Sequence, residues 1–128
     1  AKELNKEEDY QYYLKRALNY QNVFDTATGF MRPKTADGRW IEPFDPIWSG
    51  GQGRREFYTE NNGWNYTWYV PHDVEGLIGL MGGREKFTDK LQTMFETNVP
   101  LYQKYDFLKQ YPDMTGWIGM YSHGNEIT

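Results

Sequence analysis

Aromatic side chains are unusually abundant in this chain, and they limit the kind of core that it can build. Its 128 residues include 11 Tyr, 7 Phe and 5 Trp, against 17 Leu, Ile and Val together. Tyrosine and tryptophan carry large apolar rings but also polar groups that need hydrogen-bond partners. We therefore expect part of the aromatic surface to line grooves outside the core. A chain of this length makes one domain that buries roughly two-thirds of its unfolded surface.

Composition excludes several classes of protein. The net charge of -4 and the pI of about 5.2 argue against a nucleic acid or an anionic membrane as partner, because both require a basic face. The mean hydropathy of -0.88, without any apolar run near about 20 residues, excludes a transmembrane helix. The absence of cysteine excludes a disulfide framework, a zinc ribbon and a thiol nucleophile.

Both ends of the chain indicate a piece of a larger protein. It begins with AKEL, which is neither an initiator Met nor a signal peptide, and it ends with NEIT. We expect residues 1–128 to be a single segment of a larger domain, without an internal boundary.

Apolar spacing predicts three helices. The first covers residues 6–25, with a capping box at Asn5 and Glu8 and with Gly29 helping to end it. The second covers residues 71–81, with Pro71 in its first turn. Gly82-Gly83 then interrupts the pattern, and a third helix follows over residues 84–97, which makes a helical hairpin.

The segments between and after these helices lack periodicity. Residues 29–57 are rich in Gly and Pro, which predicts a long structured loop with a short hairpin around Asp37-Gly38. Pro100 and Pro112 bracket a tyrosine-rich connector that has room for a short helix. The predicted fold is mainly α, with helical hairpins and long aromatic-rich loops, as in part of a larger helical toroid.

The segment YTENNGWNYTWYVPHD, residues 58–73, carries the strongest chemical indication. The carboxylate of Glu60 lies among aromatic rings and the amides of Asn61, Asn62 and Asn65. Rings stack on the apolar face of a sugar, amides bind hydroxyls, and a carboxyl group performs acid–base chemistry. A half-buried aromatic strand with a polar turn would give the same composition.

Other chemistries have little support. The chain has no phosphate-binding loop, dinucleotide fingerprint, G-x-S-x-G or H-E-x-x-H motif. His72 and His123 are its only histidines, so a transition-metal site would depend on carboxylates, and each histidine is expected to be a structural hydrogen-bonding group. A hard cation such as Ca²⁺ could use oxygens of Asn125 and Glu126.

Glycoside hydrolysis uses two carboxyl groups, and the chain offers five candidates. Asp73 and Glu75 are explained by the first turn of a helix, where acids stabilise the dipole. Asp113 follows Pro112 and is explained by a turn. Glu60 and Glu126 have no such explanation, because both lie in irregular segments next to aromatic residues.

Two long strings then resemble a known family. YTENNGWNYTWYVPHDVEGLIGLMGG is similar to the core motif of glycoside hydrolase family 92, the calcium-dependent exo-α-mannosidases. PDMTGWIGMYSHGNE resembles the next motif of that family, PDISGLIGQYAHGNE. FDTATGFMRPKTADGRWIEPFDP also matches in character, so the resemblance covers nearly the whole chain in collinear order.

The resemblance implies an inverting hydrolase of terminal α-mannosides, with an (α/α)6 toroid as its catalytic domain and Ca²⁺ as cofactor. Glu60 matches the glutamate of the family's T-E-G-N-A-W pattern, which is taken as the general acid, and its aromatic neighbours suit that role because exclusion of water favours a protonated carboxyl. Asn125 and Glu126 match the H-G-N-E pattern and would bind calcium or sugar. Trp64 would line the pocket.

The chain also departs from the family pattern. Asn61 and Gly63 replace the usual Gly and Ala, and Asn65 stands where Gln is common. The family's general base lies in an acidic motif further downstream, beyond Thr128. We therefore expect the isolated chain to be an inactive fragment of a secreted or periplasmic α-mannosidase that acts on mannose-containing glycans. A non-catalytic carbohydrate-binding module and an interaction or scaffold fragment are the alternatives.

Overall fold

The computed structural model describes residues 1–50 and 57–119. The α-helices are α1 (Glu7–Ala17), α2 (Gly63–Tyr66), α3 (Val74–Leu80) and α4 (Arg84–Glu96). The 3-10 helices are η1 (Lys2–Leu4), η2 (Leu18–Val23), η4 (Leu101–Gln103) and η5 (Asp106–Gln110). Strands are β1, Phe24–Asp25, β2, Phe30–Met31, β3, Asn98–Pro100, and β4, Thr115–Trp117. The prediction of a mainly helical chain with long loops is confirmed for this part.

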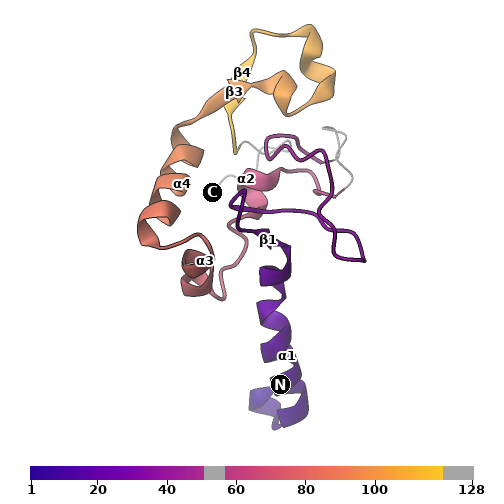
Figure 1. Ribbon diagram of the computed structural model, residues 1–128, viewed down its shortest axis with the longest axis vertical. Helices are drawn as coiled ribbons and strands as arrows, with labels where there is room; N and C mark the ends of the chain where they lie inside the picture. The colour runs from indigo at the N-terminus through magenta and orange to yellow at the C-terminus, as the bar shows by residue number, and fades with distance from the viewer. Residues whose placement is uncertain (51–56, 120–128) are drawn as a thin grey trace.

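The first predicted helix is present, but its start differs from the prediction. It consists of α1 followed directly by the 3-10 helix η2. The first turn of α1 contains acidic residues and its last turn contains basic residues, as the helix dipole favours. The predicted capping box at Asn5 and Glu8 is wrong. Asn5 instead ends η1 with a φ of 52°, and Lys6 precedes α1 without a side-chain cap. None of the residues of α1 is buried, and the helix projects from the rest of the molecule (Figure 1).

A tight hairpin follows η2. β1 and β2 pair antiparallel, with Phe24 opposite Met31 and Asp25 opposite Phe30. Gly29 lies in the turn between them with a φ of 73°, a conformation that glycine adopts without strain. The expectation that Gly29 helps to end the first helix is therefore wrong, since strand β1 and the turn after it separate Gly29 from η2.

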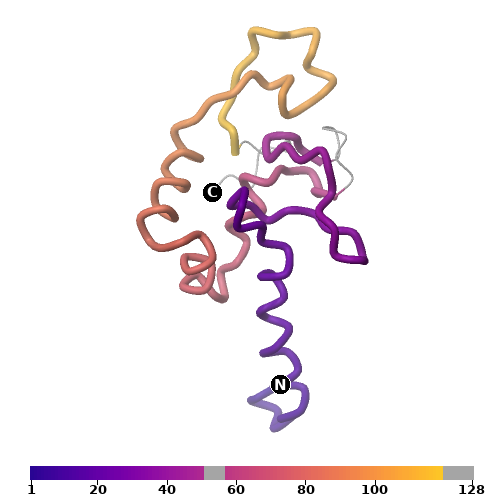
Figure 2. Tube along the Cα trace, viewed as in Figure 1, coloured from indigo at the N-terminus to yellow at the C-terminus, as the bar shows by residue number. Residues whose placement is uncertain are grey.

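The long loop begins as predicted. An isolated bridge between Lys34 and Trp40 and a turn bond from Gly38 N–H to Thr35 C=O, 2.9 Å, confirm the small hairpin at Asp37-Gly38. Residues further along this loop lie beside the segment that contains α2 (Figure 2), because Gly63 N–H donates to Pro46 C=O over 3.0 Å and Gly50 N–H donates to Asn61 C=O over 2.8 Å.

The helical hairpin of α3 and α4 is confirmed. Gly82 and Gly83 turn the chain between the two helices with φ values of 89° and 113°. Asp73, however, is the residue that begins α3, where its carboxylate accepts the Gly76 N–H over 3.0 Å. Pro71 lies before this cap and outside the first turn, so α3 is shorter than predicted.

A second small sheet was not predicted. β3 pairs antiparallel with β4, and Val99 lies opposite Gly116. The predicted connector between Pro100 and Pro112 lies between these strands and contains η4 and η5. A strand is predicted from alternating apolar and polar residues over at least four positions, and each of these strands has only three residues.

Two clusters of buried side chains form the core. The first contains Phe24, Met31, Val70 and Leu77, and the second contains Met94, Val99 and Ile118. Trp68 packs against both and so connects them. In the described ranges, no helix combines the length and the apolar character needed to cross a membrane.

A buried ion pair fixes the start of the long loop to β1. Arg32 contacts Asp25 at 2.9 Å, and both side chains are more than nine-tenths buried. Arg32 also pairs with Glu42 and lies 4.9 Å from the Phe44 ring centre. Burial raises the pKa of Asp25, but hydrogen bonds from Arg32 and from the Ala27 N–H outweigh this effect, so the pKa lies below its usual value.

We expect Asp25→Ala to lower the free energy of unfolding by about 3 kcal/mol, because it leaves a buried guanidinium with only one carboxylate. The matched change Asp37→Ala removes an exposed pair with Arg39 and should cost no more than about 1 kcal/mol. Urea unfolding of both variants measures the difference. Because the folded pKa of Asp25 is lowered, its stabilisation is present above the usual value of 3.8 and is lost as pH falls further. Equal losses in the two variants would contradict this account.

Candidate active site

Glu60 lies in the loop that leads into α2 and has an unusual backbone conformation. Its φ is 57°, and it shares positive φ with only one other non-glycine residue, Asn5, in the described ranges. A residue with a Cβ atom in this region costs about 1–2 kcal/mol. Such strained positions cluster at functional sites, where the position of a side chain matters more than local stability. Glu60 is half-buried.

Asn62 caps α2 and connects it to two distant segments. Its side chain is fully buried, and its Oδ1 accepts the Asn65 N–H over 3.2 Å. Its Nδ2 donates to the carbonyls of Ile47, over 3.1 Å, and Ile118, over 2.9 Å. A neutral amide has two N–H donors and one carbonyl acceptor, and all three groups are used here.

The same region holds Ile118 and Gly119, which follow β4 within the second motif. Lys104 Nζ donates to the Ile118 carbonyl over 3.0 Å, and Asn65 Nδ2 donates to the Gly119 carbonyl over 2.8 Å. Lys104 is fully buried, and burial lowers its pKa to about 7. Sequence reasoning missed Lys104, because nothing in its local pattern distinguishes it from an exposed lysine.

Of the predicted site residues, Glu60 and Trp64 lie in the described structure, and Asn125 and Glu126 lie outside the described residues. The Trp64 ring meets Phe30 edge to face, with ring centres 4.9 Å apart, and packs against the second core cluster. Its Nε1 is buried and finds no hydrogen-bond acceptor within residues 1–50 and 57–119. The roles of Asn125 and Glu126 stay predictions.

A second lysine, Lys90, lies beside Trp64. Lys90 Nζ lies 3.2 Å from the centre of the Phe30 ring and 4.7 Å from that of Trp64. Burial lowers the pKa of Lys90 to about 8. Sequence analysis did not identify this residue, since it lies on α4 among exposed polar residues and only the tertiary packing brings it to the two rings.

Two of the other candidate carboxylates, Asp73 and Glu75, and His72 make structural contacts, as expected. Asp73 caps α3 and accepts the Tyr20 hydroxyl over 2.8 Å. Glu75 pairs on the surface with Arg84. His72 Nε2 lies 2.8 Å from the Ala17 carbonyl. These contacts account for the side chains without a catalytic role.

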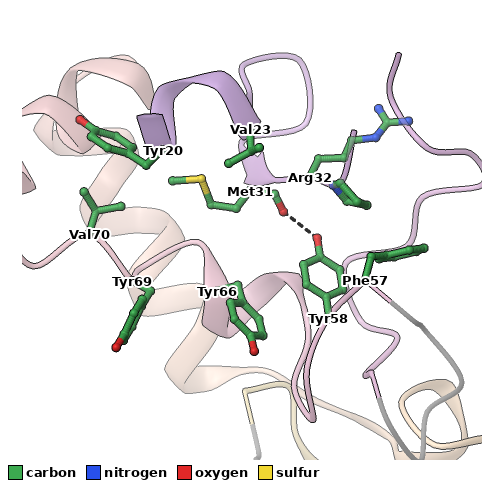
Figure 3. Close-up of a pocket in the computed structure, with 10 residues that line it drawn as sticks. Tyr20, Val23, Met31, Arg32, Phe57, Tyr58, Tyr66, Tyr69 and Val70 are labelled. Carbon is green, nitrogen blue, oxygen red and sulfur yellow. Dashed lines mark hydrogen bonds between the residues drawn. The ribbon is translucent and has the colours of Figure 1, made fainter. Parts of the chain in front are cut away.

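An open groove of about 290 Å³ includes Tyr58 in its lining (Figure 3). Four tyrosines line it, Tyr20, Tyr58, Tyr66 and Tyr69, together with Phe57, Arg32 and several apolar residues. Tyr58 Oη donates to the Met31 carbonyl over 2.6 Å, and the Tyr58 and Tyr66 rings stack with centres 5.5 Å apart. Glu60 is not among the residues that line this groove.

Within the part of the chain that the structure describes, residues 1–50 and 57–119, no three Asp, Glu or His side chains gather closely enough to hold a metal ion such as Ca²⁺. The predicted ligands Asn125 and Glu126 fall outside that part.

Comparison with known proteins identifies the class as glycoside hydrolase. A secreted glycosidase of Arthroderma benhamiae that is named uncharacterized is 32% identical to the chain, over 71% of the chain and 14% of that protein. The structure of a family GH92 α-mannosidase from Bacteroides thetaiotaomicron is similar with a TM-score of 0.68 and 42% identity, over 78% of this chain and 12% of that one. The same mannosidase in complex with mannoimidazole gives a TM-score of 0.69 at 40% identity, over 78% and 13%.

A further structure, an inverting mannosidase of the same family and species, is similar with a TM-score of 0.66 and 40% identity, over 74% of this chain and 12% of that one. All of residues 1–128 match the glycosyl hydrolase family 92 catalytic domain. The chain belongs to this family. It spans about 12–14% of the length of these relatives.

The strained backbone at Glu60 yields a stability prediction. We expect Glu60→Gly to be more stable than Glu60→Ala by roughly 0.5–1 kcal/mol, because glycine relieves the positive φ, while its larger unfolded-state entropy offsets part of the gain. The matched pair Glu75→Gly and Glu75→Ala lies inside α3, where alanine should instead be favoured by about 1 kcal/mol. Urea unfolding of the four variants measures both differences. The same sign at both positions would show that Glu60 is not strained.

Proposed function

We propose that this chain forms part of the active site of an inverting α-mannosidase that removes terminal mannose from glycans. Membership of family 92 and the mannosidases among its structural neighbours support the substrate class. The inverting outcome is supported by the similar Bacteroides enzyme that is described as an inverting mannosidase. The observation that carries the catalytic part of the proposal is the positive φ of Glu60.

Glu60 is proposed as the general acid. A carboxylic acid in this role protonates the glycosidic oxygen as the bond to the leaving group breaks, while a second carboxylate activates water on the opposite face of the sugar. The loop that carries Glu60 is fixed by the cap of α2 that follows it, so the backbone from which the carboxyl group extends has a defined position. Strain of about 1–2 kcal/mol is retained at a residue whose position matters for the reaction.

The remaining roles follow the family pattern. Trp64 is proposed to contact the substrate, and Asn125 and Glu126 to bind the sugar or Ca²⁺, which would supply charge stabilisation to the mannose hydroxyls. The general base is proposed to lie outside this chain, in the much longer parent protein that the relatives indicate. Export from the cell is proposed as well, because the similar Arthroderma protein is named as secreted.

The helices are proposed to belong to an (α/α)6 toroid. In support, α1 and η2 expose apolar side chains that an isolated domain would be expected to cover, with exposed fractions of 60% for Tyr13, 47% for Leu14 and 49% for Leu18. Large contiguous exposed apolar surfaces usually mark an interface. Residues 1–128 are accordingly proposed as a single segment of the toroid.

The acid role predicts a dependence on the leaving group. In the full-length parent enzyme, we expect Glu60→Gln to lower kcat/KM at least a hundredfold for a mannoside with a poor leaving group, because the leaving oxygen then departs unprotonated. A mannoside with an activated aryl leaving group needs no protonation and should keep most of its turnover. Steady-state kinetics with the two substrates measures both effects.

The control for this measurement is Glu75→Gln, which removes a surface carboxylate that pairs with Arg84. We expect it to change neither substrate's kcat/KM by more than about twofold, as for a remote surface change. Equal losses on both substrates in Glu60→Gln would overturn the assignment of Glu60 as the acid.

The position of the base outside the chain predicts that the isolated 128 residues do not hydrolyse α-mannosides. Turnover by the chain alone would contradict this.

Calorimetric titration of the same chain with mannobiose, first with Ca²⁺ and then with EDTA, tests whether Asn125 and Glu126 bind calcium. Calcium-dependent binding supports Asn125 and Glu126 as ligands, and its loss in the double variant Asn125→Ala, Glu126→Ala is expected.

The tyrosine-lined groove favours a second candidate function, a non-catalytic carbohydrate-binding surface. Tyr69 is 81% exposed, and flat aromatic faces in an open groove suit stacking on sugar rings. Glycan binding that is lost in Tyr69→Ala but unchanged in Glu60→Gln would favour this function, and the opposite pattern would favour the hydrolase site.

A further inference from the structure

The carbonyl of Ile118 accepts hydrogen bonds from two fully buried side chains. Asn62 Nδ2 approaches it at 2.9 Å and Lys104 Nζ at 3.0 Å. The Ile118 N–H donates to the Thr97 carbonyl over 2.9 Å, and the side chain lies in the second core cluster. The Ile118 backbone is therefore held at both its N–H and its carbonyl, by groups from three different segments.

These contacts connect the two motifs of the proposed site. Asn62 follows Glu60 by two residues, so its cap and its side-chain bonds fix the end of the acidic loop. Ile118 and Gly119 directly precede the sequence MYSHGNE, and Asn65 adds a third bond, to the Gly119 carbonyl. The acidic loop and the middle of the second motif, at Ile118 and Gly119, are thus joined by side-chain hydrogen bonds as well as by the backbone.

Lys104 is the less expected member of this arrangement. Its side chain is fully buried, and moving an ammonium group out of water carries a penalty of several kcal/mol. An apolar side chain of similar length, such as methionine, would fill this space without that penalty. The lowered pKa of Lys104, about 7, is the sign of this cost. The hydrogen bond of Lys104 to the Ile118 carbonyl offsets part of this cost and connects the side chain to the site.

We propose that Asn62 and Lys104 are positioning residues of the mannosidase site, which hold the Ile118 carbonyl from two sides and thereby fix Glu60 relative to the second motif. This inference rests on the proposed function, because it needs Glu60 to be the acid. Neither residue is required to touch the substrate. Displacement of about 1 Å at a catalytic group can lower activity by up to a hundredfold, so a positioning bond is measurable.

The test uses the full-length parent enzyme and the change Lys104→Met. Methionine preserves the length and most of the volume, and Asn62 still donates to Ile118, so the fold keeps one of the two bonds. We expect kcat/KM for the poor leaving group to fall between about tenfold and a hundredfold more than for the activated leaving group. The ratio between the two substrates in one sample does not depend on the folded fraction, so lost stability alone leaves it unchanged.

A double-mutant cycle with Glu60→Gln completes the test. If Lys104 acts through the acid, Lys104→Met should change the ratio by less than about twofold when Glu60 is already replaced. The matched control is Lys109→Met, which removes an exposed lysine of the same connector that pairs with Asp106. It should leave the ratio unchanged.

Two results would overturn the proposal. One is an unchanged ratio in Lys104→Met, whether both substrates lose activity equally, as for a purely structural residue, or neither loses any. The other is the same change of ratio with and without Glu60. If Glu60→Gln alone loses both substrates equally, the acid assignment fails and the positioning role fails with it. If Glu60→Gln behaves as loss of the acid and Lys104→Met does not alter the ratio, only the positioning role fails.

Discussion

The hydrogen bonds of one buried side-chain amide, that of Asn62, hold the centre of this molecule together. Asn62 has no access to water, so each of its polar groups must find a partner in the protein. It does so by capping α2 and by binding the carbonyls of Ile47 and Ile118, which belong to the long loop and to the end of β4. Loss of any of these partners leaves a buried polar group unpaired, which costs about 1–3 kcal/mol. The loop, α2 and the second sheet therefore depend on one another.

The same dependence explains the position of Glu60. The residue is followed at once by a segment that cannot shift without breaking the Asn62 contacts, and its own backbone takes the positive φ that joins the loop to the helix. Strain at a single residue is tolerated when its surroundings determine its conformation. The departure of Gly63 from the family's usual alanine has a local reason as well. A methyl group there would lie 3.2 Å from Pro46 and from the Tyr58 hydroxyl, so its neighbours would have to move slightly.

Elements with a regular apolar period were predictable, and elements defined by contacts across the chain were not. The helix of α1 and η2, the α3–α4 hairpin and the turn at Asp37-Gly38 follow from spacing and from glycine, which act locally. The capping box at Asn5 failed, because η1 takes this residue as its own end. The β3–β4 pairing was missed because each strand has only three residues, and its partner lies beyond a long connector.

The sequence by itself determined the family and the helical character, and it singled out Glu60 and Glu126 as the acidic residues without a structural explanation. These properties lie in local strings and in the types of the residues. Only the tertiary structure decided that Trp64 packs between Phe30 and the second core cluster, that Lys90 lies beside both rings, and that Lys104 is buried against Ile118. The burial of a side chain and the partners that it contacts depend on which distant segments meet in space. Separation along the sequence does not show this.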